Sequence, residues 1–590
     1  MTPQSSDTQD LIERVIEIPD FYLMDLSSDG KEAAVISSET GSYQLFSIST
    51  ETTETTQLST GEDRVIYAAF SPDSQRVAFS RDFEGREQHQ LFTVPVSGGG
   101  EAQIGTLASI RVFDFTWSPM KSEIAFAGAT REANGLWLMD TESGDHSMVY
   151  RGKHWVFGPE WTHDGSKICV TARTTDHPTA SEIVFIDPRT AEFDVYTPKE
   201  GSENVSPKWS PDDASVLFKT DSGGTYELAI YRLGENGISY LQAGKLGLAV
   251  EYPFFGWMPD GERVWYLAAK DGRTKLYLET LDGGRPEQMP LEKGYHTNLK
   301  VAESGRFAVY SWSALSRPAT LSKYDFATNS TTVLRETHSP IPLGRAERAS
   351  YETFDGRTIH GFMVKPPQEG GPRPCVLWIH GGPAWEVADE WNPAIQAFAV
   401  TGYNLFAPNI RGSTGYGVEF QNLNIKDLGG DDLKDVAEAR KYLQTRRDVE
   451  SEKVAIVGAS YGGFITFLAM TKLPQLWAAG VAIVGITDWK EMYELSDAAF
   501  RSFIEKYMGI PKENQELYND RSAINFVDRI AAPILIWHRG NDSRCPLRPV
   551  ERFVEKLKNL GKMHEFRVVW DEGHGPQKTR NLARQYKAAV

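Results

Sequence analysis

A block that recurs seven times dominates the first half of the chain. Each copy has an aromatic or apolar residue, then a turn similar to Ser-Pro-Asp-Gly, then alternating apolar residues. The copies begin, at spacings of 44, 47, 44, 48, 48 and 44 residues, at Leu26, Phe70, Trp117, Trp161, Trp209, Trp257 and Val301. A turn between two strands of period 2, repeated at this spacing, is typical of one four-stranded propeller blade. The repeat therefore predicts a seven-bladed β-propeller, which we place at residues 21–335.

Two residues of the repeat are expected to be structural. Tryptophan heads four of the copies, and a ring of this size can fill the wedge between two neighbouring sheets. We therefore expect these tryptophans to pack between blades rather than to stack on a ligand. The aspartate of the turn, for example Asp73 or Asp212, is expected to hydrogen-bond its own backbone in an Asx-type turn.

The pattern changes after residue 335. The repeats stop, and a stretch rich in proline and glycine follows at 366–372. Amphipathic helical patterns then alternate with uniformly apolar runs at 374–379, 454–457, 480–484 and 533–537. Apolar strands alternating with such helices indicate a mostly parallel sheet covered on both faces. We therefore predict a doubly wound α/β domain at 336–590, opened by a hairpin whose turn is Asp355-Gly356.

Composition limits the partners that the chain can have. The chain has 62 Lys and Arg residues and 80 Asp and Glu residues, a formal net charge of −18. An acidic surface repels phosphate groups, so we expect neither a nucleic-acid nor a membrane partner. Its 3 cysteines have no metal-binding spacing, so we expect no disulfide framework, metal or cofactor. With a polar start and no apolar run of membrane-spanning length, a cytoplasmic protein is expected.

The strongest chemical signal is the sequence Gly458-Ala-Ser460-Tyr-Gly462. It follows directly on the apolar run 454–457 and leads into a helical pattern at 464–470. Between a strand and a helix, a G-x-S-x-G sequence is a nucleophile elbow, in which glycines permit the tight turn that exposes the serine. We therefore predict an α/β-hydrolase domain with Ser460 as its nucleophile.

A serine nucleophile needs a base, and in this fold an acid and then a histidine follow it along the chain. Among the histidines after Ser460, only His574 follows the last predicted strand, where the base is expected. Asp542 follows the preceding strand, and we predict that it orients the imidazole and stabilises the imidazolium. Asp571 is a rival acid, but it lies close before His574, and we expect it to cap that loop.

An oxyanion formed by attack on a carbonyl needs preorganised N–H donors. The residue after the nucleophile, Tyr461, is predicted to supply one of them through its backbone. The second should come from the loop after the first parallel strand, where His380-Gly-Gly382-Pro forms a turn with open amides. We predict the N–H of Gly382 as this second donor.

Together these features resemble the prolyl oligopeptidase family of serine peptidases. The resemblance rests on the predicted propeller and on the segments HGGP at 380–383, NIRGSTGYG at 409–417, GASYGG at 458–463, NDSR at 541–544 and EGH at 572–574. Within the family, the segment 488–505 resembles the acylaminoacyl peptidases. Those enzymes release an N-acylated amino acid from the blocked end of a short peptide.

The resemblance implies residue roles that the residues alone do not give. Ser460, Asp542 and His574 match the family triad. Arg544 matches an arginine that binds the carbonyl of the substrate residue before the one at the scissile bond; unaided, it would be interpreted as a solvated loop charge. The residues that match the lining of the apolar specificity pocket are Trp489, Phe500, Phe503 and Ile504. Without the resemblance, the last three would be interpreted as one face of a helix in the core.

Four further expectations follow from the resemblance. The propeller would cover the active site and admit only short peptides. The segment 1–20 would form a helix from about Asp7 to Ile16 that packs on the hydrolase domain rather than on the first blade. The tail after His574 would be shorter than in most members. Because the chain lacks the Glu-Glu pair with which the family's dipeptidyl peptidases hold a free amino terminus, we do not expect selection of a free amine.

The sequence therefore predicts a serine hydrolase that acts on short, N-acylated peptides. Another oligopeptidase or a carboxylesterase on the same triad is the near alternative, because an apolar pocket also accepts acyl esters. An interaction protein, with the propeller as binding module and an inactive hydrolase unit, is an alternative of a different class. The oligomeric state is left open, and a homo-oligomer is compatible with the sequence.

Overall fold

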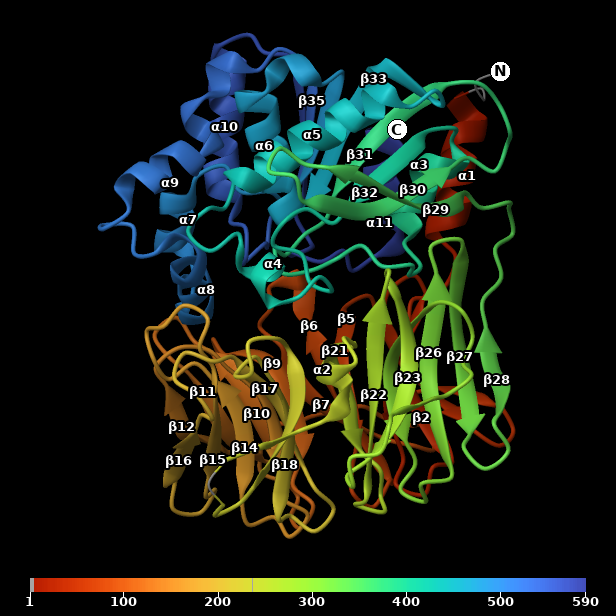
Figure 1. The fold of residues 1–590 in the computed structure, drawn as a ribbon, viewed down its shortest axis with the longest axis vertical. Coiled ribbons are helices and arrows are strands. Elements are labelled where there is room, and N and C mark those ends of the chain that lie inside the picture. The colour runs from red at the N-terminus through yellow and green to blue at the C-terminus, as the bar shows by residue number, and fades with distance from the viewer. Residues whose placement is uncertain (1–4, 236) are drawn as a thin grey trace.

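The computed structural model describes residues 5–235 and 237–590. Its lower half in Figure 1 is a ring of seven four-stranded antiparallel sheets, and its upper half is built on one eight-stranded sheet. The predicted fold class, a seven-bladed propeller followed by an α/β-hydrolase domain, is confirmed. Residues 1–4 of the predicted N-terminal segment and residue 236 of the predicted propeller lie outside the described residues.

Each blade consists of four consecutive strands that pair in chain order. The first four blades are β1 (Phe21–Leu26), β2 (Glu32–Ser37), β3 (Gln44–Ser49) and β4 (Thr55–Gln57); β5 (Arg64–Phe70), β6 (Arg76–Asp82), β7 (Gln90–Pro95) and β8 (Ala102–Gln103); β9 (Arg111–Trp117), β10 (Glu123–Ala129), β11 (Asn134–Asp140) and β12 (His146–Gly152); and β13 (Val156–Trp161), β14 (Ile168–Ala172), β15 (Glu182–Ile186) and β16 (Phe193–Tyr196). The last three are β17 (Asn204–Trp209), β18 (Ser215–Thr220), β19 (Glu227–Arg232) and β20 (Ser239–Tyr240); β21 (Ala249–Trp257), β22 (Arg263–Lys270), β23 (Arg273–Thr280) and β24 (Glu287–Gln288); and β25 (Tyr295–Val301), β26 (Phe307–Ala314), β27 (Arg317–Asp325) and β28 (Ser330–Glu336).

The repeated turn joins the first and second strands of each blade, and both predictions about its residues are confirmed. The indole N–H of Trp117 donates to the carbonyl of Ala69 in the preceding blade at 3.1 Å, and two other repeat tryptophans make the same kind of bond. The carboxylate of Asp73 accepts the backbone N–H of Gln75 at 3.0 Å. The repeat thus fixes both the turn and the packing between blades.

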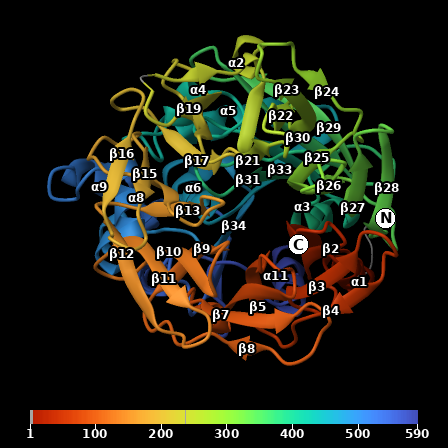
Figure 2. The ribbon, with the colours of Figure 1, turned by 90° about the horizontal axis from the view of Figure 1, so that it is seen from below.

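The ring closes through direct contacts between the first and the last blade (Figure 2). The N–H of Leu23 donates to Ser311 Oγ at 3.0 Å, and Phe21 and Val309 belong to one buried apolar cluster. Among the described residues every blade is made of consecutive strands, so these residues exchange no strand at the closure.

The eight-stranded sheet has the order β29-β30-β32-β31-β33-β34-β35-β36. The predicted hairpin is confirmed as β29 and β30, which turn at Gly356, and the neighbours from β32 to β36 are parallel. The strands are β29 (Arg345–Glu352), β30 (Thr358–Lys365), β31 (Arg373–Ile379), β32 (Asn404–Pro408), β33 (Val449–Ala459), β34 (Ala479–Ile483), β35 (Ile534–Arg539) and β36 (His564–Val569). Because parallel strands end at one edge, the loops after β31, β33, β35 and β36 meet there.

Helices cover both faces of this sheet through two separate buried clusters. One face carries α5 (Asp431–Thr445), α6 (Tyr461–Lys472) and α10 (Leu547–Asn559). The other carries α1 (Ser5–Ile16), α3 (Pro393–Val400) and α11 (Thr579–Ala589). The remaining helices are α2 (Gln242–Lys245), α4 (Val418–Asn422), α7 (Trp489–Leu495), α8 (Ala498–Met508) and α9 (Gln515–Arg521).

Helix α1 precedes the first blade in the sequence but packs on α3 and α11, on the hydrolase domain, where the N-terminal segment is expected. The short tail after His574 forms α11, which belongs to the same cluster. Among the helices of the described residues, none combines the length and the apolar character needed to cross a membrane.

The propeller faces the edge of the sheet where the parallel strands end (Figure 1). The segment 82–87 of blade 2 lies against the loops that follow β35 and β36. Gln577 Nε2 donates to Asp82 Oδ2 at 3.0 Å, and Asn541 Nδ2 donates to the carbonyl of Glu84 at 2.8 Å. The loops most expected to carry chemistry are therefore covered by the propeller.

Candidate active site

Ser460 lies in the sharp turn between β33 and α6. Its φ and ψ are 59° and −120°, a combination that non-glycine residues adopt only when the surroundings enforce it. A Cβ atom at Gly458 would lie 2.3 Å from the carbonyl oxygen of Gly462, and one at Gly462 would lie 2.0 Å from that of Ile379. The two glycines are therefore required by packing, which is what the nucleophile elbow predicts.

The structure brings the three predicted triad residues together in series. Ser460 Oγ lies 2.9 Å from His574 Nε2, and His574 Nδ1 lies 3.0 Å and 2.9 Å from the two carboxylate oxygens of Asp542. An ionised carboxylate can only accept, so Nδ1 carries the proton and Nε2 is left to accept the proton of Ser460. This is the arrangement of a serine nucleophile with its base and acid.

Asp542, not Asp571, is the carboxylate that meets the histidine. It also accepts the backbone N–H groups of Arg544 at 2.9 Å and Cys545 at 2.8 Å. Burial alone would raise the pKa of Asp542, but the imidazole of His574 and these hydrogen bonds outweigh it and hold the pKa below its usual value. Asp571 instead pairs with Lys578 Nζ at 2.6 Å. Asp542 is therefore ionised and fixed in place beneath the imidazole.

Two backbone N–H groups are available beside Ser460. Tyr461 is the first residue of α6, so its N–H has no partner inside the helix. Gly382 lines the same cavity as Ser460, and no other described residue accepts the N–H of either Gly382 or Tyr461. The phenol of Tyr461 turns into the core and contacts Asp432. The predicted oxyanion donors thus lie at the nucleophile with their backbone hydrogens free.

The loop that carries Gly382 is held by the second motif of the resemblance, at 409–417. His380 Nε2 lies 2.9 Å from Ser413 Oγ, and burial lowers the pKa of His380 to about 4, so the ring is neutral. Asn409 accepts the N–H of Val387 at 2.7 Å and donates to its carbonyl at 3.0 Å. The two motifs therefore form one hydrogen-bonded unit that fixes the loop.

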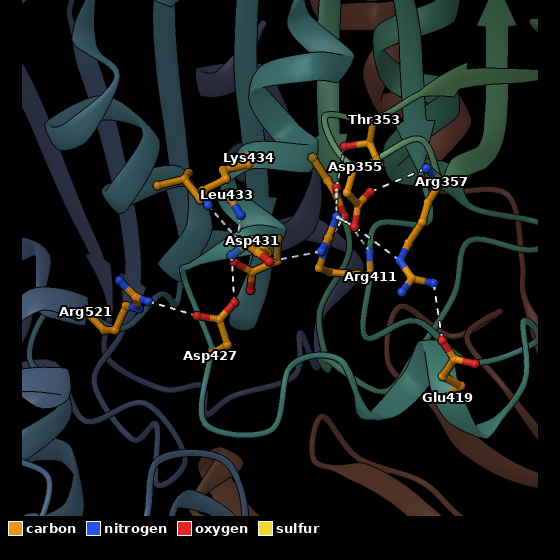
Figure 3. Close-up of polar contacts among 12 residues, drawn as sticks. Thr353, Asp355, Arg357, Arg411, Glu419, Asp427, Asp431, Leu433, Lys434 and Arg521 are labelled. Atoms are coloured by element: carbon orange, nitrogen blue, oxygen red, sulfur yellow. Dashed lines mark hydrogen bonds and ion pairs between the residues drawn. The ribbon is translucent and has the colours of Figure 1, made fainter.

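Arg411, in the 409–417 segment of this unit, lies among several carboxylates (Figure 3). Its guanidinium binds Asp435 through two bonds of 2.9 Å and 2.8 Å and pairs with Asp355 at 3.3 Å and Asp431 at 3.2 Å. Arg411 is only 2% exposed, so breaking this network would leave a buried charge unpaired. The chain needs an arginine here to hold the 409–417 loop rather than to touch substrate.

A cavity of about 490 Å³ opens beside Ser460 and His574. Trp489, Phe500 and Phe503 line it together with Arg544, as the resemblance implies. Ile504 is not among the lining residues; it is fully buried in the hydrophobic core of the domain. On α8 the two half-buried phenylalanines line the cavity, whereas Ile504 packs in the core cluster, so its assignment to the pocket is corrected to a core residue.

Sequence reasoning missed two propeller residues in this site, Glu87 and Arg111. Glu87 Oε1 accepts Arg544 Nε at 2.6 Å, and its Oε2 pairs with Arg111 at 3.2 Å. Arg111 also pairs with Asp497 at 2.9 Å and lies 5.4 Å from the ring centre of Phe500. A lone glutamate in the loop between β6 and β7 and a lone arginine at the start of β9 carry no sequence signal, so only the fold shows that Glu87 meets Arg544 and Arg111.

Sequence reasoning also missed the support of the His574 loop. Arg539 Nη1 donates to the carbonyl of His574 at 2.7 Å and pairs with Glu572 at 3.3 Å. Glu572 Oε1 in turn accepts the backbone N–H of Lys578 at 3.0 Å and Asn581 Nδ2 at 3.0 Å. The EGH motif indicates that Glu572 belongs to the family pattern. It does not indicate that Glu572 holds the His574 loop by accepting hydrogen bonds from Lys578 and Asn581.

Among the described residues, one group of three could ligate a metal: Asp542, Cys545 and His574, whose ligand atoms lie within 4.8 Å of one another. Asp542 and His574 are already bonded to each other. Burial raises the pKa of the Cys545 thiol well above its usual value. Two of the three candidate donors, Asp542 and His574, are thus already engaged in the triad.

Two parts of the chain match models of known families. Residues 390–590 match the prolyl oligopeptidase family, and residues 132–341 match the TolB β-propeller domain. The chain is 28% identical over 338 residues to an uncharacterized peptidase, YuxL, of Bacillus subtilis, which covers 56% of this chain and 50% of that protein. It is 23% identical over 554 residues to dipeptidyl aminopeptidase BIII of Pseudoxanthomonas mexicana, which covers 88% of this chain and 78% of that protein.

Solved structures with the same fold span nearly the whole chain. A puromycin-hydrolyzing peptidase of Mycobacterium tuberculosis superimposes with a TM-score of 0.86 at 19% identity, covering 100% of this chain and 95% of that one. An acylaminoacyl peptidase of Pyrococcus horikoshii superimposes with a TM-score of 0.73 at 20% identity, covering 96% and 95%. At these identities the likeness concerns the fold.

Proposed function

We propose, on the premise that this chain is a serine hydrolase of the prolyl oligopeptidase family, that it releases an N-acylated amino acid from the blocked end of a short peptide. The observation that carries the proposal is the hydrogen-bonded series of Ser460, His574 and Asp542 beside an apolar cavity. Relatives in the family include dipeptidyl peptidases and an acylamino-acid-releasing enzyme, so the choice between a blocked and a free amino terminus rests on the site.

In the proposed reaction, Ser460 Oγ attacks the carbonyl carbon of the first peptide bond while His574 Nε2 accepts the hydroxyl proton. The carbonyl oxygen becomes an oxyanion that accepts the N–H groups of Tyr461 and Gly382. His574 then donates its proton to the leaving nitrogen, and the carbon–nitrogen bond breaks. A water molecule, deprotonated by His574, attacks the acyl ester and releases the N-acyl amino acid.

The charges around Arg544 favour an uncharged amino terminus. Glu87 is a propeller carboxylate that could hold a substrate ammonium group, but its oxygens are engaged by Arg544 and Arg111. Although burial opposes its ionisation, these guanidinium groups lower the pKa of Glu87 to about 2. An ammonium group would have to displace an arginine, whereas an acylated nitrogen brings no charge to this position.

The position of the propeller favours short substrates. Its segment 82–87 bonds to the loops that carry Asp542 and His574. A folded protein chain would collide with the propeller before its peptide bonds could approach Ser460. A short, flexible peptide has no such restriction.

A panel of substrates on one enzyme sample tests the proposal. Acetyl-aminoacyl, free aminoacyl, dipeptidyl and internal-proline amides are compared by kcat/KM, with Ser460→Ala as the blank. We expect the acetyl-aminoacyl amide to be cleaved best. Preference for the free aminoacyl or dipeptidyl substrate would contradict the acylaminoacyl specificity and leave the hydrolase standing.

A carboxylesterase remains the second candidate, because the wall of Trp489, Phe500 and Phe503 would accept an acyl ester as well as an amide. The same panel, extended by acetyl-phenylalanine methyl ester, separates the two. An esterase would cleave the ester and leave every amide intact.

A further inference from the structure

A second, larger cavity of about 870 Å³ lies between the propeller and the hydrolase domain. Trp155, Phe157 and Phe254 of the propeller line it on one side, and Trp385 and Tyr416 of the hydrolase domain line it on the other. Its volume lies in the range of about 300–1,000 Å³ that is usual for ligand sites. None of the residues assigned so far to catalysis or to the acyl side of the substrate lines this cavity.

Trp385 connects the two cavities, because its side chain lines both of them. Trp385 is 63% exposed, although it lines the space between two domains. Its backbone is fixed: the N–H donates to Pro383 at 2.8 Å, and the carbonyl accepts the N–H of Thr414 at 3.1 Å. A large apolar ring that is held in place and left uncovered at the mouth of a cavity is typical of a ligand-binding surface.

The reaction geometry says which part of a substrate meets Trp385. With its oxygen directed at the N–H of Gly382, the reacting carbonyl has two other substituents, the acyl side and the leaving nitrogen. The acyl side is assigned to Trp489, the two phenylalanines and Arg544, which line only the smaller cavity. The leaving nitrogen and its substituents therefore extend along the remaining wall, past Trp385 and into the larger cavity.

We propose that Trp385 and the larger cavity bind the leaving part of the substrate and select an apolar, aromatic residue on the leaving side of the scissile bond. This inference rests on the proposed hydrolase function and adds a specificity determinant on the side of the bond that the acyl pocket does not touch. The aromatic side chain packs on the Trp385 indole, and the rest of the leaving peptide lies among the propeller aromatics.

Two amides that differ only in the leaving residue test the inference: acetyl-Phe-Phe-amide and acetyl-Phe-Gly-amide. Both are amidated, so neither brings a carboxylate close to Glu203, Glu386 and Glu390, which line the cavity. We expect the wild type to prefer the phenylalanine leaving group by roughly tenfold or more in kcat/KM, because one fully placed apolar group gives discrimination of this order. Trp385→Ala should reduce the ratio to about twofold or less, and Trp385→Phe should retain most of it.

Acetyl-phenylalanine methyl ester, whose leaving group is too small to reach Trp385, is the internal control. Because Trp385 also lines the cavity beside Ser460, Trp385→Ala should reduce hydrolysis of this ester less than it reduces hydrolysis of acetyl-Phe-Phe-amide. The matched control variant is Phe193→Ala. Phe193 is an aromatic residue that is 53% exposed on the outer strand of blade 4, so its loss should leave the kcat/KM ratio of the two amides unchanged.

Three results would overturn the inference: equal rates on the two amides in the wild type, a ratio that Trp385→Ala leaves intact, or an ester rate that falls as far as the amide rate. The last result would mean that Trp385 merely supports the Gly382 loop. If the folded wild type cleaves none of the three substrates, the proposed function itself fails.

Discussion

Ser460 shows how much a single position depends on its neighbours. The serine adopts a strained backbone conformation because Gly458 and Gly462 allow α6 to approach β33 and β31 more closely than any side chain would permit. The strain places Oγ at the start of α6, within 2.9 Å of His574 Nε2. The reactivity of this residue is therefore a property of the turn as much as of the hydroxyl group.

Gly462→Ala tests that dependence. The new Cβ would meet the carbonyl oxygen of Ile379 at 2.0 Å, so α6 and β31, which ends at Ile379, must separate. We expect a loss of about 1–3 kcal/mol in the free energy of unfolding, measured by urea denaturation, together with a loss of activity. Gly371→Ala is the matched control, because apart from its two chain neighbours no described residue lies within 4 Å of the Cβ it would add. Equal stability of the two variants would contradict the packing argument.

Asp542→Asn tests the assignment of the acid. The amide can no longer hold the imidazole with its proton on Nδ1, so we expect kcat to fall by about 10⁴-fold with little change in KM. Asp571→Asn, the matched control, removes only an ion pair with Lys578 and should keep kcat within a few-fold of the wild type. If the two variants lost activity equally, the triad would have to be reassigned.

At the scale of elements, α8 joins the pocket to the propeller. Asp497 caps its first turn by accepting the N–H of Phe500 at 2.8 Å and also pairs with Arg111 of the propeller at 2.9 Å. One carboxylate thus fixes the start of the helix that carries Phe500 and Phe503. The pocket wall is held in place from both domains.

Asp497→Ala should therefore affect specificity as well as stability. Loss of a cap costs about 1 kcal/mol, and the freed helix start lets the pocket wall move. We expect kcat/KM to fall further for an acetyl-phenylalanine amide than for an acetyl-alanine amide, because only the larger side chain depends on the wall. The control Asn392→Ala removes the cap of α3. Its free energy of unfolding should fall, while the ratio of kcat/KM for the two amides stays constant. A constant ratio in Asp497→Ala would contradict the role of α8.

The elements that sequence predicted correctly are those with local causes. The turn chemistry of the repeat and the glycines of the elbow act within a few residues, and they determined the blades and the position of Ser460. Order along the chain and the parallel sheet together predicted the meeting of Ser460, Asp542 and His574. Ile504 was assigned wrongly because a helical face predicts which residues lie together, not whether that face meets a cavity or the core.

At the scale of the whole molecule, the propeller completes the site. The contact between Glu87 and Arg544 joins residues 457 positions apart in the chain, and no local sequence pattern predicts such a pair. The same is true of the bond between Asp82 and Gln577, which ties blade 2 to the loop of His574. Only the way in which the two domains face each other determines these contacts.

The stability of this interface should depend on pH through Asp82. Burial raises the pKa of Asp82 to about 7, with the charge of Glu87 adding to the effect and Arg64 opposing it. Between pH of about 4 and that value, the folded protein holds a proton that the unfolded chain has lost, so the free energy of unfolding falls as pH rises, by at most about 1.4 kcal/mol per pH unit. Gln577 Oε1, buried without a partner among the described residues, can accept that proton when its amide turns.

Asp82→Asn removes the titrating carboxyl group and keeps the shape of the side chain. The Tm of this variant should therefore depend less on pH between pH 5 and 8 than the Tm of the wild type. Asp73→Asn is the control: the hydrogen bonds of its turn lower the pKa of Asp73, so its stabilising effect is lost only below this window. A wild-type profile as flat as that of Asp82→Asn would contradict the prediction.

The central claim is that Ser460 is a nucleophile activated by His574, and labelling with a fluorophosphonate tests it most directly. Mass spectrometry of the intact and digested protein should show one adduct per chain, on Ser460, and His574→Ala should slow its formation by about 10³-fold or more. A folded wild-type protein that takes up no label, or takes it up on another serine, would contradict the claim.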